Sequence, residues 1–160
     1  MEQSIENSDL DWEAQVVASH YRLQHTPVWS AHDPKAVSAD WHTQHVLFHV
    51  TLLSACPSTR LIDIAAALRD ANRIYLSWSS GVTLDSHHRD YEGEHAAIKD
   101  AALARDAPLA STLLRSHLNK TAHILIDHLH RVGKASRAEV NSLPGSLGHG
   151  DSHPSQVPTP

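Results

Sequence analysis

The chain has 160 residues, 41% of them hydrophobic, and its 18 acidic against 13 basic side chains give a net charge of −5. This length suits one domain with a substantial core, and an acidic chain with scattered Lys and Arg argues against a nucleic-acid surface. The acidic start and the short apolar runs predict neither a signal peptide nor a membrane span. The single cysteine, Cys56, excludes an internal disulfide and favours a cytoplasmic protein.

The first two predicted helices are recognised from apolar side chains at helical spacing. One helix covers residues 9 to 24. The sequence HDPK predicts the start of the next, with Asp33 as its N-cap and Pro34 at its first helical position. This second helix continues to about Cys56. The side chains on its predicted inward stripe are Trp41, His45, Phe48, His49, Leu52, Leu53 and Cys56.

Three further helices are predicted by the same spacing. The third runs from Ser58 to about Ser79, residues 81 to 87 form a loop, and the fourth runs from about His88 to Ala104. Asp106 then caps a last helix of roughly 24 residues. The third helix has a predicted inward stripe made of Leu61, Ile64, Ala65, Leu68, Asn72 and Tyr75.

The predicted fold class is all-α, an antiparallel helical bundle with a disordered C-terminal tail. The bundle covers residues 1–131. No segment alternates convincingly between apolar and polar residues at the period of a strand, which supports the all-α class. Residues 132–160 are rich in Gly, Ser and Pro and bury too little apolar surface to offset the entropy of ordering. We therefore expect one folded domain followed by the tail.

Four of the 15 histidines fall on predicted inward stripes. His45 and His49 in HVLFH are four residues apart and share one helical face. His95 and His117 each lie eleven residues from Asp106, so an antiparallel hairpin brings them to one level. An unpaired buried imidazole costs about 1 to 3 kcal/mol, and one divalent metal ion satisfies all four. The alternative is that each is a core histidine with its own hydrogen bond.

Three functions are compatible with such a site. HVLFH lacks the general-base glutamate of a metalloprotease because Val46 occupies that position. Glu94 points about 100° away from His95 on a helix, which suits a supporting or surface residue better than a catalytic base. His20 is an undecided fifth participant. A ligand sensor needs the metal only as an anchor for a small anion. This favours a sensor over the two alternatives, a metal-dependent hydrolase or lyase and a purely structural bundle.

Three segments in order resemble the FCD domain, the ligand-sensing domain of the FadR branch of GntR-type bacterial transcription regulators. They are HVLFHVTLLSAC (45–56), EHAAIKDAALARDAPLA (94–110) and LLRSHLNKTA (113–122), within a resemblance from about Trp12 to Leu129. The resemblance implies a divalent metal held by His45, His49, His95 and His117, with His45 at a position where many relatives have Asp. A nitrogen-rich site of this kind favours Zn or Ni over Mn or Mg.

The resemblance also implies partners. The expected effector is a small organic acid or sugar acid, with Arg73 of NRIY as the matching ligand-binding residue, although Asn72 lies nearer the centre of the stripe. Thr121 lies one helical turn beyond His117, and this position makes it a second candidate ligand-binding residue. We expect a homodimer that senses its effector for a transcription regulator and is not an enzyme. Family members carry a winged helix-turn-helix and a first bundle helix ahead of this region. The sequence as given shows neither, so we expect no direct DNA contact and an exposed apolar groove.

Overall fold

The computed structural model describes residues 1–33, 36–78 and 89–142. Within these residues the chain is helical, with one isolated backbone bridge, and the predicted all-α class is confirmed. No helix in this part of the chain is long and apolar enough to span a membrane. The predicted loop at 81–87 lies outside the described residues. The helices are α1 (Glu2–Glu6), α2 (Leu10–Gln24), α3 (Ala39–Leu53), α4 (Thr59–Trp78), α6 (Tyr91–Leu103) and α7 (Ala107–Ser142).

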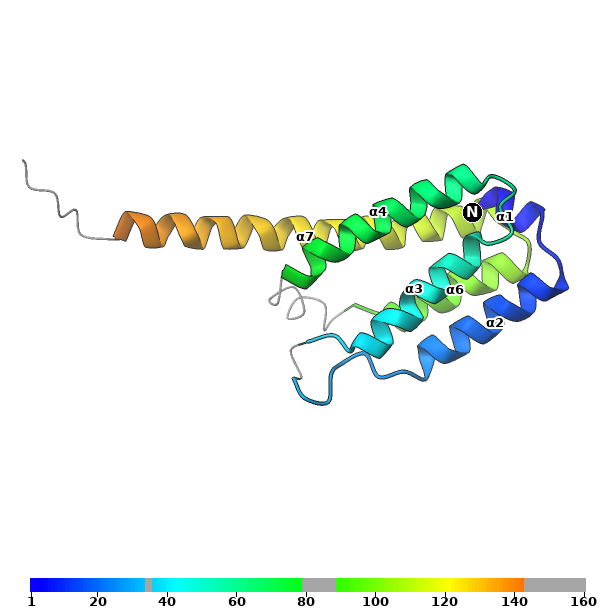
Figure 1. Cartoon of the computed structure of the whole chain (residues 1–160), viewed down its shortest axis with the longest axis horizontal. Helices are drawn as coiled ribbons and strands as arrows, with labels where there is room; N and C mark the ends of the chain where they lie inside the picture. Colours follow the sequence, from blue (N-terminus) through cyan, green and yellow to red (C-terminus); the bar gives the residue numbers. More distant parts are fainter. Residues whose placement is uncertain (34–35, 79–88, 143–160) are drawn as a thin grey trace, which may run out of the picture.

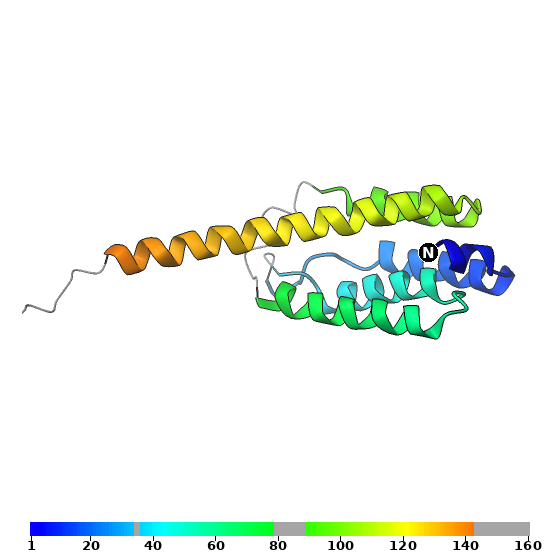
Figure 2. The ribbon, with the colours of Figure 1, turned by 90° about the horizontal axis from the view of Figure 1, so that it is seen from above.

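Successive long helices run antiparallel to one another (Figure 1). Seen from above, α6 and α7 form one layer, and α2, α3 and α4 lie in the other (Figure 2). Extensive contacts join α2 to α3 and to α6, and α6 to α7. The two layers therefore meet along α2 and α6, and the core lies between them. Its buried apolar side chains are Ile5, Trp12, Val16, Leu23, Trp41, Phe48, Leu52, Ile98, Ala101, Ala102, Ala107 and Ala110.

The first predicted helix is confirmed at both ends, but the predicted start of the second was wrong. Asp9 caps α2 through its side chain. Asp33 does not begin α3, which starts at Ala39 with Ser38 as its N-cap. The preceding segment is a loop in which the Ser38 N–H donates to the Val28 carbonyl, and an isolated bridge closes it. These cross-loop bonds satisfy backbone groups that a helix from Asp33 would have paired internally. Pro34 lies outside the described residues.

The last helix is longer than predicted. Asp106 caps it as expected, because its Oδ1 accepts from the Leu109 N–H at 3.0 Å. However, α7 has 36 residues and ends at Ser142, so it includes residues 132–142 that the sequence assigned to the tail. The helix extends well beyond the other helices (Figure 1). Residues 143–160 lie outside the described part of the chain, and the disorder predicted there stays a prediction.

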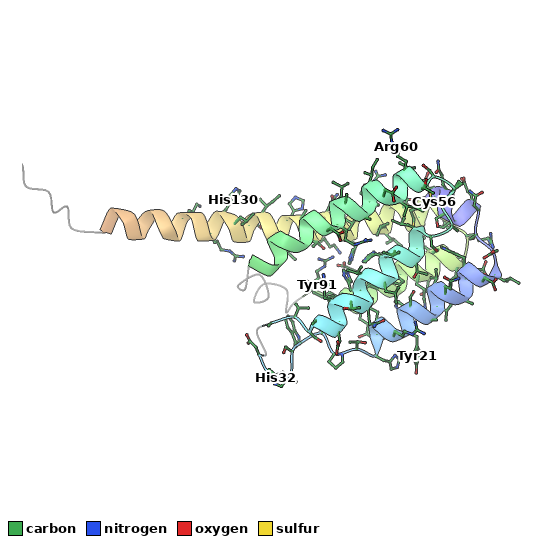
Figure 3. All side chains as sticks on the ribbon, in the orientation of Figure 1. Tyr21, His32, Cys56, Arg60, Tyr91 and His130 are labelled. Atoms are coloured by element: carbon green, nitrogen blue, oxygen red, sulfur yellow. The ribbon has the colours of Figure 1, made fainter. Side chains whose placement is uncertain are left out.

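The inward face predicted for the third helix, α4, was also wrong. Leu61, Ile64 and Leu68 are 51%, 48% and 68% exposed. Arg69 instead lies on the partly buried side. Figure 3 shows Arg60 of this helix projecting away from the bundle. Among the described residues α4 takes part in none of the extensive helix–helix contacts. Helical periodicity locates an apolar stripe, but it does not say which molecule covers it.

Candidate metal centre

Four imidazoles meet between α3, α6 and α7, and we call these residues the four-histidine cluster. They are His45 and His49 of α3, His95 of α6 and His117 of α7, and one ring nitrogen of each lies within 4.8 Å of the others. The Nε2 atoms of His45 and His49 are 3.1 Å apart, and the ring centres of His95 and His117 are 4.7 Å apart. The structure thus brings together the four side chains that the sequence suggested as metal ligands.

Aromatic side chains of α3 form one wall of the cluster. Trp41 stacks on His45 with ring centres 4.7 Å apart, and Phe48 meets His95 edge-on at 5.5 Å. Burial holds the pKa of His45 and of His49 well below the ordinary value, and the neighbouring imidazoles lower it further. The rings are therefore neutral at physiological pH, which leaves lone pairs on nitrogen that a metal can accept.

His95 provides the sharpest indication that the cluster holds a cation. It is 2% exposed, and its buried Nε2 atom has no hydrogen-bond partner in the described part of the chain. Burial, followed by the charge of His117, lowers the pKa of His95 to about 3, so protonation does not resolve the deficit. A buried nitrogen with no partner is uncommon in a native core. Coordination to a metal shared with the other three rings would satisfy it, so the donor set fits a divalent ion.

Glu94 supports His117. Its Oε2 atom lies 2.9 Å from Nδ1 of His117, which favours the tautomer with Nδ1–H donating to the carboxylate and leaves Nε2 of that ring as an acceptor. Burial alone would raise the pKa of Glu94, but hydrogen bonds from Arg89, Lys120 and His117 together lower it to about 2. This arrangement of carboxylate and imidazole is the usual support of a metal-bound histidine.

Arg89 completes this support, and the sequence analysis did not identify it. Its guanidinium donates to both oxygens of Glu94 at 2.6 to 3.1 Å and to the His117 carbonyl at 2.9 Å. It also lies 4.5 Å above the ring of Tyr91. The side chain is 7% exposed, so these contacts replace water. Arg89 falls at the start of the predicted fourth helix and just before the observed α6, and no pattern in the sequence distinguishes it from the other scattered arginines.

The other predicted site residues have different outcomes. Thr121 lies beside the cluster, but its hydroxyl accepts from Arg89 at 2.9 Å and donates to the His117 carbonyl at 3.1 Å. Its role in ligand binding stays a prediction. The side chain of Arg73 lies outside the described residues. His20 is 6% exposed and packs edge-on against Phe48 at 5.5 Å, but it does not belong to the four-histidine cluster.

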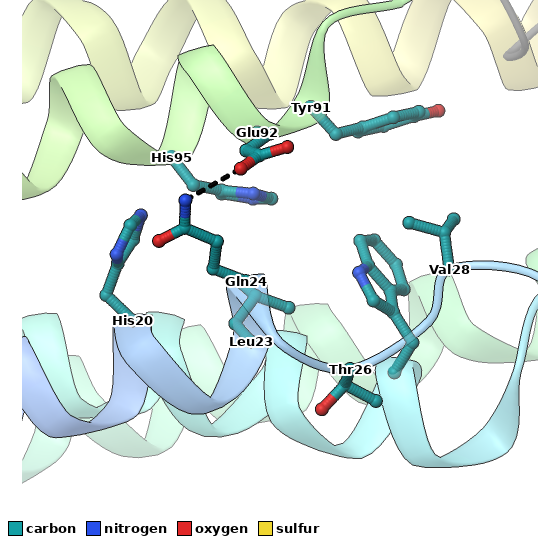
Figure 4. A pocket seen from close by; sticks show the side chains of 9 residues that line it. His20, Leu23, Gln24, Thr26, Val28, Tyr91, Glu92 and His95 are labelled. Atoms are coloured by element: carbon teal, nitrogen blue, oxygen red, sulfur yellow. Dashed lines mark hydrogen bonds between the residues drawn. The ribbon is translucent and has the colours of Figure 1, made fainter.

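A cavity of about 50 Å³ lies beside His95 between α2 and α6. Gln24 and Glu92 cross its edge through a hydrogen bond of 2.7 Å from Nε2 to Oε1 (Figure 4). His20 and Tyr91 line it from opposite sides (Figure 4). The space suits a few water molecules and is far smaller than a typical organic-ligand site. A larger ligand would enter this cavity only if the side chains that line it moved.

Arg69 brings a positive charge toward the cluster from α4. Its Nε atom is buried and has no hydrogen-bond partner among the residues that the structure describes. After burial and the neighbouring imidazoles, the charge of Arg69 is a further cause of the lowered pKa of His49. A buried guanidinium nitrogen without an acceptor is as unusual as the unpaired nitrogen of His95. An anion near His49 would satisfy it.

Comparisons with known proteins relate the chain to one family of domains. The family model of the FCD domain matches residues 1–120. The chain is 33% identical over 129 residues to the uncharacterized HTH-type transcriptional regulator BphR of Paraburkholderia xenovorans (strain LB400), covering 78% of this chain and 50% of that protein. It is 30% identical over 110 residues to the HTH-type transcriptional repressor GlaR of Escherichia coli (strain K12), covering 68% and 49%. The chain spans about half the length of these curated relatives. No solved structure matches it.

Proposed function

Because the chain belongs to the FCD domain family, we propose that it is the ligand-sensing domain of a transcription regulator. In this proposal a divalent metal held by the four-histidine cluster anchors a small organic acid or sugar acid. The observation that carries the proposal is the unpaired, buried Nε2 of His95 among three other imidazoles. Hydrogen-bonded core histidines, the main alternative, would each have a partner.

The donor set favours zinc or nickel as the metal. All four ligands would be neutral imidazoles, because burial lowers the pKa of each ring. Such nitrogen donors suit Zn and Ni better than Mg or Mn, which prefer oxygen. Glu94 would fix the tautomer and orientation of His117 through its hydrogen bond. When bound, the metal would supply positive charge and open coordination positions for a carboxylate.

Arg69 is the described residue best placed to hold the second charged group of such an acid. Its partly buried position on α4 and its unpaired Nε are what an anion ligand requires. Arg73, one turn further along the same helix, stays a second candidate. Thr121 supports Arg89 in the ligand-free arrangement, and a ligand would have to displace that bond to use its hydroxyl. A dicarboxylate or sugar acid matches two separated positive charges better than a monocarboxylate does.

We assign no catalytic role to the site. The carboxylate beside the cluster, Glu94, has a pKa of about 2 and is held by Arg89 and Lys120. A base of this strength, with its lone pairs engaged, is poorly matched to proton transfer near neutral pH. Sensing instead requires only that the ligand bind two arrangements of the helices with different affinity. DNA binding would belong to the helix-turn-helix part of a full regulator, and the regulator would act as a homodimer.

Metal analysis tests the first part of the proposal. Protein purified without chelators should contain about one Zn or Ni per chain, and His95→Ala should lose it while remaining folded by circular dichroism. His123→Ala is the matched control, because His123 is exposed and its ring bonds to the Asn119 carbonyl of its own helix. A wild-type metal content below about a tenth of an ion per chain would favour the hydrogen-bonded core instead.

Calorimetry with succinate, citrate and gluconate tests the second part. Binding should require the metal-loaded protein, and Arg69→Gln should weaken it about tenfold or more, since a charge-assisted hydrogen bond is lost. Arg115→Gln, an exposed substitution on α7, is the control. If no acid of these classes released heat on metal-loaded protein, the sensor function would lose its support while the metal site would stand.

A further inference from the structure

His20 of α2 is a buried imidazole that lies outside the four-histidine cluster. Its side chain is 6% exposed, and its ring packs edge-on against Phe48. No hydrogen bond joins it to another of the described residues. A neutral imidazole carries one N–H donor and one acceptor nitrogen, and such groups normally have partners when they are buried. His20 therefore needs polar partners that the described side chains do not supply.

His20 and His95 are neighbours across the small cavity between α2 and α6. Both rings line this cavity of about 50 Å³, and Figure 4 shows both directed into the space between the two helices. Phe48 meets each of them edge-on, with ring centres 5.5 Å apart in both cases. After burial and the charge of His117, the charge of His20 is a further cause of the lowered pKa of His95.

The second ring nitrogen of His95 lacks the support that His117 has. A metal-bound histidine usually donates its other ring N–H to an acceptor, which fixes the tautomer and the orientation of the ring. For His117 this acceptor is Glu94, whose Oε2 atom lies 2.9 Å from Nδ1. With Nε2 of His95 on the metal, its Nδ1–H has no acceptor among the described residues. The cavity beside the ring is the place from which an acceptor can reach it.

The chemistry of the cavity suits ordered water in this position. Its volume holds a few water molecules, and a buried water typically makes about two to four hydrogen bonds. His95 offers a donor and His20 a ring nitrogen. At the edge, the hydrogen bond from Gln24 to Glu92 uses the amide nitrogen of Gln24, so the amide oxygen remains as an acceptor. Water here would thus have enough polar partners on both helices.

We propose that His20 is a positioning residue for His95 and acts through water held in this cavity. The Nδ1–H of His95 donates to the water, and the water donates to a ring nitrogen of His20. This inference rests on the metal site of the proposed function and adds a support for a second ligand ring. His20 does for His95 through water what Glu94 does for His117 directly.

Zinc competition with a chromophoric chelator tests this support. His20→Leu fills the position without a polar atom and should weaken zinc binding about tenfold, the lower end of the usual effect of losing such a partner. His20→Gln keeps a hydrogen-bonding group and should stay within about threefold of the wild type. Leu23→Val is the matched control, because Leu23 is buried on the same helix and lines the same cavity with an apolar side chain. Its zinc affinity should be unchanged.

Proton NMR of the zinc-loaded protein with isotope-labelled histidine gives a readout that a packing role would not move. The Nδ1–H of His95 should be protected from exchange in the wild type and in His20→Gln and lose this protection in His20→Leu. The Nδ1–H of His117 should stay protected in all three, and circular dichroism establishes that each is folded.

Two results overturn the role of His20 and leave the metal site standing. One is a His20→Leu protein that retains either wild-type zinc affinity or the protected His95 proton. The other is a His20→Gln protein that loses as much affinity as His20→Leu, since shape alone would then matter. A wild-type protein that binds no zinc would refute the metal site itself, and the role of His20 with it.

Discussion

Glu94→Gln is the substitution that most directly probes how the site is built. It keeps the shape of the side chain and removes the charge that accepts hydrogen bonds from Arg89, Lys120 and His117. The pKa of Glu94 is about 2 against an ordinary 4.5, and this difference corresponds to about 3 kcal/mol in favour of the charged form. That stabilisation is full above pH 4.5 and disappears as the pH falls toward 2.

Two losses are expected from Glu94→Gln. Solvent still reaches Glu94, whose side chain is 16% exposed. The metal-free protein should therefore lose about 1 to 2 kcal/mol of unfolding free energy at neutral pH rather than the full amount. Zinc affinity should also fall about 10- to 100-fold, because the carboxylate that orients His117 and raises its basicity is gone.

Competition with a chromophoric chelator measures the zinc affinity, and thermal unfolding with excess chelator measures the stability. Glu92→Gln is the matched control: it makes the same chemical change on the same helix, but its carboxylate is exposed and bonds to Gln24. Unchanged zinc affinity in Glu94→Gln would refute the reasoning that Glu94 supports a metal ligand. Equal losses in both variants would indicate a general effect of charge instead.

Three further outcomes are expected. The chelator-treated protein should become less stable from about pH 7 to about pH 5. Burial lowers the pKa of His95 from 6.5 to about 3, so the unfolded chain binds the proton first, and His95 alone accounts for about 2 kcal/mol at about pH 5. The same melting temperature at pH 7 and pH 5 in the chelator-treated protein would contradict this prediction. Ile98→Ala should cost about 3 kcal/mol in urea unfolding because Ile98 is fully buried, whereas the same change at the exposed Leu109 should cost under about 0.5 kcal/mol. Ser38→Ala should cost about 1 kcal/mol through loss of the α3 cap, and an effect no larger than that of the exposed Ser116→Ala would locate the helix start elsewhere.

Much of the bundle follows from local rules that the sequence states clearly. The side chain of Asp106 caps α7 where the sequence predicts, because an N-cap acts within one helical turn, and α2 begins within one residue of its predicted start. The proximity of the four histidines follows from two such rules. One is the four-residue spacing on α3, and the other is the equal distance of His95 and His117 from their turn. Neither rule requires knowledge of contacts across the molecule.

The features that the sequence analysis missed depend on contacts between distant segments. Asp33 and Ser38 are both good capping residues, and hydrogen bonds across the loop decide between them. Arg89 owes its role to His117, which lies 28 residues away and one helix further along the chain. The extension of α7 through Gly133 to Ser142 continues past a composition that favours a tail. In each case the local pattern allows two outcomes, and the tertiary structure selects one.

The orientation of α4 is the miss with the largest functional consequence. Its apolar stripe satisfies every sequence criterion for an inward face, yet Leu61 and Leu68 are exposed. An apolar stripe indicates that a helix face is buried, either against the chain's own core or against another molecule. Arg69 lies on the partly buried side of the helix, toward the cluster. A leucine at this position would offer no positive charge to an acid.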